Sequence, residues 1–149
     1  MDRIAESRHE QIWKLVDLRL ELVVLYAVGD ADGPCAGHVK IGVSTRAAYA
    51  SEMKTLRNYR SSEVVTKYET IVSGKGRAEL LKTALLAALG DKGFAYRSWR
   101  SANDGEIAAI VGNLSTTYGV ALLSHDDAIA LEHQTFEAIA EKEFGGPIR

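Results

Sequence analysis

The chain has 149 residues, of which 46% are apolar and 26% charged, and this composition is typical of one globular domain with its own buried core. No apolar run approaches the roughly 18 residues that a membrane span needs, and the charged, amphipathic start differs from a secretory signal, so we expect no membrane partner. The single cysteine, Cys35, allows no internal disulfide and favours a reducing, cytoplasmic location.

Charge is distributed unevenly along the chain. Residues 1–39 carry four Lys or Arg against seven Asp or Glu, residues 40–100 carry twelve against five, and residues 101–149 carry two against eight. The net charges of the three parts are therefore −3, +7 and −6, which give the overall −2. A basic centre between acidic ends is typical of a module that binds a polyanion, and a merely solvated basic face is the alternative interpretation.

The first part of the chain predicts a helix followed by a β-hairpin. Residues 2–19 place apolar side chains near helical spacing. Residues 20–28 are apolar at every position but Glu21, which favours a strand covered on both faces. In residues 39–43, valine and isoleucine alternate with lysine and glycine, as in a half-covered strand. The turn-forming residues between these two runs predict a hairpin with a long loop.

The rest of the chain predicts one more strand and several helices. The patterns indicate a helix over 45–58, a strand over 63–72 and a helix over 77–89 that ends at Gly90. Residues 93–100 form an irregular segment rich in basic and aromatic side chains. Two further helices are expected over 102–114 and 124–144, and a Ser–Asp capping pattern marks the start of the second.

These elements predict an α/β protein of the α+β type. We expect a small three-stranded sheet flanked by helices, with an extra helix at each end of the chain. The expected organisation is a single domain over 1–149, with an N-terminal helix in 1–19, a core in 20–100 and an acidic C-terminal helical extension in 101–149.

Two short motifs on the predicted hairpin resemble those of the GIY-YIG nuclease superfamily. Leu25-Tyr26-Ala27 stands in the place of the first motif, and Lys40-Ile41-Gly42 stands in the place of the second. The chain is most similar to the branch, common in phages and bacteria, in which Lys-Ile-Gly replaces Tyr-Ile-Gly. The expected order of strand, strand, helix, strand and helix agrees with the family, and Arg97-Ser98-Trp99-Arg100 stands where this branch typically has Gly-Glu-Trp-Phe. The resemblance covers roughly residues 22–114.

The resemblance implies hydrolysis of a phosphodiester with one divalent metal, Mg²⁺ or Mn²⁺. It assigns proton transfer to Tyr26 and a hydrogen bond to phosphate to Lys40. It further implies a cation, for which Arg46 is the nearby candidate, to offset charge on phosphorus, and a metal-binding carboxylate, for which Glu79 is the candidate. A metal activates water and a cation stabilises developing charge, so each role has a physical basis.

Two positions depart from the family pattern. Alignment of the helix after Lys-Ile-Gly puts Glu52 where the family has its arginine, and Arg46 is out of register. Alignment of the 77–89 helix puts Lys82 where the metal-binding carboxylate belongs, with Glu79 one turn earlier. The sequence therefore leaves open whether the catalytic site is intact or degenerate.

A set of cationic and aromatic side chains suggests how nucleic acid would be held. Cations bind phosphates and rings stack on bases, and proteins that follow a single strand combine the two. The residues predicted to contact nucleic acid are Arg57, Arg60, Lys67, Arg97, Trp99 and Arg100.

Three functions compete on these observations. The first is a metal-dependent nuclease of the GIY-YIG type acting on DNA or RNA. The second is a catalytically inactive module of the same fold that binds nucleic acid. The third is an accessory or regulatory factor, of a phage or a bacterium, that binds a protein partner through its acidic C-terminal helix.

Overall fold

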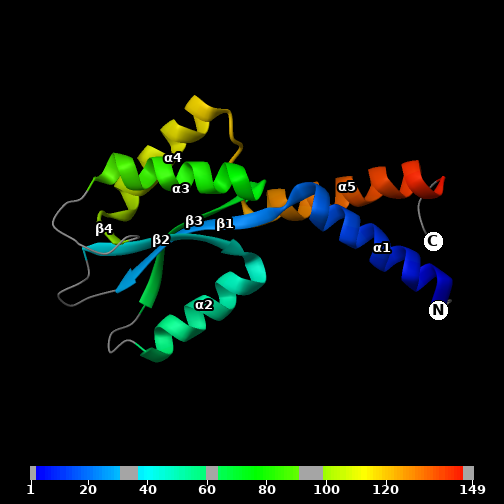
Figure 1. Cartoon of the computed structure of the whole chain (residues 1–149), viewed down its shortest axis with the longest axis horizontal. Coiled ribbons are helices and arrows are strands. Elements are labelled where there is room, and N and C mark those ends of the chain that lie inside the picture. The colour runs from blue at the N-terminus through cyan, green and yellow to red at the C-terminus, as the bar shows by residue number, and fades with distance from the viewer. Residues whose placement is uncertain (1–2, 31–36, 60–63, 91–98, 146–149) are drawn as a thin grey trace.

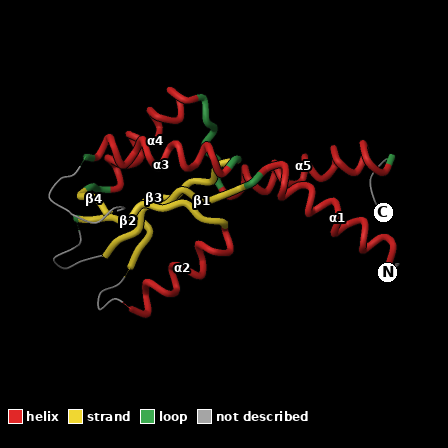
Figure 2. The backbone as a smooth tube through the Cα atoms, viewed as in Figure 1, coloured by secondary structure: helices red, strands yellow, loops and turns green. Residues whose placement is uncertain are grey.

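The computed structural model describes residues 3–30, 37–59, 64–90 and 99–145. They form a sheet with helices on both faces and a pair of helices that extends to one side (Figures 1 and 2). Among the described helices, none is long and apolar enough to cross a membrane. In chain order the elements are α1 (Arg3–Leu20), β1 (Leu22–Asp30), β2 (His38–Thr45), α2 (Arg46–Tyr59), β3 (Val64–Ser73), α3 (Lys75–Leu89), β4 (Trp99–Ser101), α4 (Asp104–Tyr118) and α5 (His125–Phe144).

The sheet has the strand order β3-β1-β2-β4, and every neighbouring pair is antiparallel. The predicted hairpin of β1 and β2 is confirmed, and its register sets Tyr26 opposite Gly42 and Val28 opposite Lys40. The expectation of three strands was wrong, because β4 adds a fourth strand that begins at the end of the segment that we predicted to be irregular. β4 has three residues, which is too short to show an alternating pattern in the sequence.

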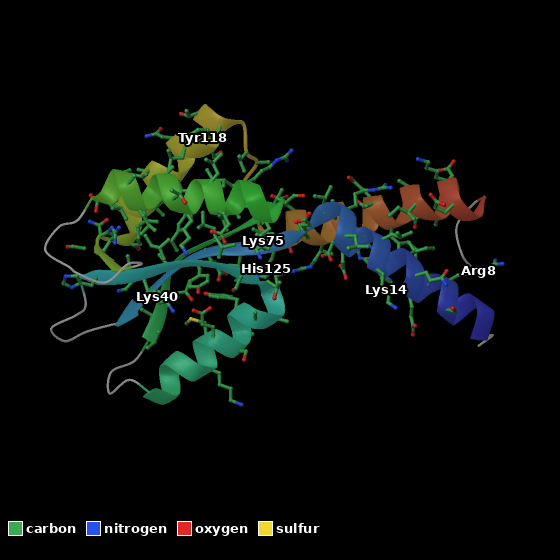
Figure 3. The ribbon with its side chains drawn as sticks, viewed as in Figure 1. Arg8, Lys14, Lys40, Lys75, Tyr118 and His125 are labelled. Carbon is green, nitrogen blue, oxygen red and sulfur yellow. The ribbon has the colours of Figure 1, made fainter. Side chains whose placement is uncertain are left out.

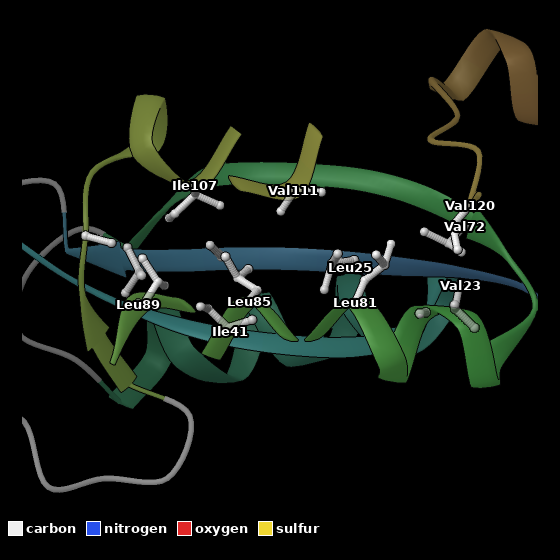
Figure 4. Close-up of a cluster of buried hydrophobic side chains, with 14 residues drawn as sticks. Val23, Leu25, Ile41, Val72, Leu81, Leu85, Leu89, Ile107, Val111 and Val120 are labelled. Atoms are coloured by element: carbon white, nitrogen blue, oxygen red, sulfur yellow. The ribbon is translucent and has the colours of Figure 1, made fainter. Parts of the chain in front are cut away.

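The residues of β1 alternate between two buried clusters, which explains why the strand is apolar on both faces. Val23, Leu25 and Ala27 pack with α3 and α4 in the main core, whereas the residues between them, such as Val24 and Val28, pack against α2. Figure 4 shows the main core between the sheet and the helices on that side, with Leu81 and Leu85 of α3 facing Leu25. The hairpin is therefore held between a large core and a smaller cluster beneath α2.

α1 and α5 form an arm that extends away from the sheet (Figure 1). Its own cluster contains the fully buried Ile12 and Val16 of α1 and Ile139 of α5. The aromatic rings of Trp13 and Phe136 reinforce it, with ring centroids 4.8 Å apart. This packing explains why both terminal segments have apolar residues at helical spacing.

The joint between the arm and the sheet has an unusual backbone conformation. Glu21 has a φ of 44°, in the left-handed region that side chains with a Cβ rarely adopt. The neighbouring carbonyl of Leu20 accepts hydrogen bonds from Ser73 Oγ at 2.7 Å and from Gly74 N at 3.0 Å. The end of β3 therefore fixes the turn from α1 into β1, and β1 begins at Leu22, two residues later than the sequence pattern predicted.

A second joint connects β3 to α5. Ile71 and Leu123 form an isolated antiparallel bridge, with backbone N···O distances of 3.0 and 2.8 Å. The next residue, Ser124, caps α5 by accepting from Asp127 N at 3.1 Å, and Asp127 Oδ2 accepts from Ser124 N in return. The predicted capping box is thus confirmed, and it anchors α5 beside the outer edge of β3.

Candidate functional site

The hairpin places Tyr26 and Lys40 on the same face of the sheet, beneath α2. Because side chains alternate along a strand, Tyr26 shares its face with Val24 and Val28, which pack against α2. Lys40 is opposite Val28 in the register and points to the same side (Figure 3). The phenol of Tyr26 and the amine of Lys40 therefore project from the same face of the sheet.

Gly42 is required where Tyr26 crosses the neighbouring strand. A Cβ added at Gly42 would lie 2.5 Å from Tyr26 Cζ and still closer to the hydroxyl oxygen, so the aromatic ring fills the space that a side chain would need. On its other side the Tyr26 ring packs against Tyr49 of α2, with centroids 4.9 Å apart and planes tilted by 35°. The glycine of Lys-Ile-Gly therefore has a packing reason, and Tyr26 is only 3% exposed.

The carboxylate of Glu52, on α2, connects Tyr26 to Lys40. Lys40 Nζ donates to Glu52 Oε1 at 2.9 Å, and the Tyr26 hydroxyl donates to the same carboxylate. The side chains of Lys40 and Glu52 are each 30% exposed, whereas Tyr26 is buried behind them. The three groups thus form a short network that runs from the surface to the inside of the α2 cluster.

The network holds protons and charges in a defined state. Burial raises the pKa of Tyr26 far above that of an ordinary phenol, and the hydrogen bond and negative charge of Glu52 add to the shift. Burial also acts to raise the pKa of Glu52, but hydrogen bonds from Tyr26 and Lys40 and the positive charges of Lys40 and Lys82 outweigh it, so the pKa lies below its ordinary value. At neutral pH the phenol is therefore protonated and the carboxylate is charged.

The other two predicted catalytic residues lie apart from this network. Arg46, the first residue of α2, forms an ion pair with Glu132 of α5, with Nη2 and Oε2 2.7 Å apart. Glu79 is on α3, which packs on the opposite face of the sheet from Tyr26. In the described part of the chain, no hydrogen bond or ion pair joins Glu79 to Tyr26, Lys40 or Glu52.

These carboxylates do not make a donor set suited to Mg²⁺ or Mn²⁺. Such ions prefer several oxygen ligands that include negative charge. Glu52, the carboxylate that accepts from Tyr26, is already paired with Lys40, and the positive charge of Lys82 lowers its pKa further. Among the residues that the structure describes, no group of three His, Cys, Asp or Glu side chains is arranged to hold a metal.

Of the residues predicted to contact nucleic acid, Trp99 and Arg100 follow each other on β4, where Trp99 is the register partner of Lys40. Arg100 pairs with Val39 in the register, and its Nε donates to the carbonyl of Leu86 on α3 at 3.4 Å. Lys67 lines a pocket with residues 101–104, at the start of α4. Arg57 and Trp99 belong to α2 and β4, but their side chains are outside the described part of the structure, as are residues Arg60 and Arg97 altogether.

The sequence did contain a signal for Glu52 and Lys82. Each carries the opposite charge from the residue that the resemblance implies at its position, an arginine and a carboxylate respectively, but a sequence does not show that the two residues act on each other. Comparison with known proteins adds no relative, since no protein-family model, curated protein or solved structure matches the chain. The site has to be interpreted from its own chemistry.

Proposed function

We propose that this chain is a nucleic-acid-binding domain of the GIY-YIG type in which the hydrolytic centre is degenerate. The observation that carries the proposal is the network of Tyr26, Glu52 and Lys40, in which a carboxylate stands where the family has its arginine. The strand order β3-β1-β2 with α2 and α3 on opposite faces supports the relationship in fold. The excess of twelve Lys or Arg over five Asp or Glu in residues 40–100 supports a polyanionic ligand.

Physical chemistry favours binding over hydrolysis at this site. A phenol that must accept a proton has to be ionised first, and the raised pKa of Tyr26 opposes that step at neutral pH. Charge on the pentavalent phosphorus needs a cation that is free to approach it, but Lys40 is neutralised by Glu52 and Arg46 by Glu132. Binding of a phosphate needs less, because a partly exposed lysine can exchange one anion for another.

Fluorescence anisotropy with labelled single-stranded and duplex oligonucleotides tests the proposal. We expect binding that weakens steeply with salt, because each phosphate contact contributes a slope of about 0.7 for single strands and about 0.9 for duplex in log K against log[salt]. Lys40→Gln should weaken binding and reduce that slope by one such contact. Lys14→Gln, an equal change of charge on the exposed side of the arm, is the matched control and should have a smaller effect. A flat salt dependence would overturn the proposal.

The same oligonucleotides distinguish binding from catalysis. Incubation with Mg²⁺ or Mn²⁺ should leave them uncut over hours. Cleavage that depends on the metal and is lost in both Tyr26→Phe and Glu79→Ala would replace this proposal by the metal-dependent nuclease. Cleavage that survives both substitutions would point to a contaminating enzyme. In that case a second purification of the Tyr26→Phe variant should remove the cleavage activity.

A further inference from the structure

The Glu52 carboxylate is surrounded by groups that ordinarily bind an anion. A buried phenol and a lysine each donate a hydrogen bond to it, and the positive charge of Lys82 on α3 also lowers its pKa. An ammonium group and a hydroxyl that donate to one carboxylate resemble the way proteins hold a phosphate oxygen.

The ion pair between Glu52 and Lys40 is accessible to solvent. Glu52 and Lys40 have side chains that are each 30% exposed, so their ion pair lies at the edge of the α2 cluster and not inside it. Ion pairs between exposed or partly exposed side chains are weak and exchange readily for other partners. Tyr26, by contrast, is fixed by Tyr49 and by the fit to Gly42, so its hydroxyl stays in place when the carboxylate leaves.

We propose that Tyr26 and Lys40 form an oxyanion site that Glu52 fills from within, and that a phosphodiester group of the nucleic acid displaces Glu52 when it binds. The identity of the ligand rests on the proposed function, whereas the oxyanion site itself does not. Glu52 then acts as a built-in competitor that lowers affinity for weakly bound polyanions and leaves Lys40 available only to a ligand that can take the place of the carboxylate.

The first test compares Glu52→Gln with the wild type in oligonucleotide binding. The glutamine keeps an acceptor for Tyr26 but removes the charge that competes with phosphate. We expect affinity for a single-stranded oligonucleotide to rise about fivefold, and the salt slope to steepen by about 0.7, as one released lysine gains a phosphate contact. Glu137→Gln, on the exposed face of α5, changes net charge equally and should leave the slope as in the wild type.

The second test uses inorganic pyrophosphate, so that it does not depend on nucleic acid. In NMR titrations, the Gly42 amide should shift on addition of pyrophosphate in Glu52→Gln at concentrations that leave the wild type unchanged. Adding Lys40→Met to Glu52→Gln should weaken that response at least several-fold. If Glu52→Gln is poorly folded by circular dichroism, Glu52→Ala replaces it, because alanine favours the helical conformation of α2.

The outcomes separate this inference from the proposed function. If the wild type binds oligonucleotides through Lys40 but Glu52→Gln behaves like Glu137→Gln and gains no pyrophosphate response, the oxyanion site is refuted and the proposed function stands. If Glu52→Gln gains pyrophosphate but no variant binds oligonucleotides, the site is supported and the proposed function fails. Failure of both measurements overturns both.

Discussion

Replacing Gly42 by alanine measures how strictly Tyr26 and Gly42 depend on each other. The new Cβ would lie 2.5 Å from Tyr26 Cζ, whereas ordinary van der Waals contact begins near 3.4 Å, so one group must move by about 1 Å. Tyr26 has little room to move, since it is 3% exposed and packs against Tyr49. Overpacking of this kind in a buried cluster costs roughly 1–3 kcal/mol of unfolding free energy.

Urea denaturation followed by tryptophan fluorescence is the assay. With a slope of about 2 kcal/mol per molar urea, the midpoint should fall by roughly 0.5–1.5 M at an unchanged slope. Gly112→Ala is the matched control, because a Cβ there meets nothing within 4 Å and lies in the middle of α4, where alanine should raise stability by up to about 1 kcal/mol.

A double-mutant cycle locates the cause. In a Tyr26→Leu background the ring is gone, so Gly42→Ala should lose most of its effect, and the coupling between the two positions should account for most of the destabilisation. The reasoning is refuted if Gly42→Ala is as stable as the wild type, or if it is equally destabilising with and without the ring.

Three further predictions concern the joints and the network. Ser124→Ala removes the cap of α5 and should lower the urea unfolding free energy by about 1 kcal/mol, and no loss would contradict the capping box. Glu21→Gly relieves the strain of the positive φ and should raise the unfolding free energy by about 1 kcal/mol. Glu10→Gly within α1 is the control and should lower the unfolding free energy by a similar amount. Equal effects of the two substitutions would show that Glu21 is not strained. Folding raises the pKa of Tyr26, so the contribution of this residue to stability is complete below the ordinary phenol pKa of about 10 and is lost as the pH rises beyond it. Tyr26→Phe should therefore flatten the fall of the urea midpoint at alkaline pH.

The sequence predicted the parts of the fold that depend on local pattern. The apolar run of β1 indicated a strand covered on both faces, and two clusters on opposite sides of Leu25 and Tyr26 confirm it. The capping pattern at Ser124 located the start of α5. In each case the deciding interactions lie within a few residues of one another or follow from the alternation of a strand, so the sequence alone carries the information.

The parts that were missed depend on contacts between distant segments. β4 forms because Trp99–Ser101 meets the start of β2, some sixty residues earlier in the chain, and three residues show no period of their own. The ion pair of Lys40 with Glu52 depends on how α2 folds back over the sheet, and the pairing of Arg46 with Glu132 depends on where α5 docks. A sequence pattern names such charged residues but does not choose their partners.

The pairing of α1 with α5 limits how the chain can be shortened. Val120 belongs to the main core, and Leu123 bridges Ile71 at the edge of the sheet, so removing residues 120–149 would cut into the body of the protein as well as the arm. It would also leave Ile12 and Val16 without the helix that shields them from water. If such a truncated chain failed to bind a partner, the failure would therefore reflect its loss of structure. Point substitutions on the outer surface of α5 are the better test of what that helix recognises.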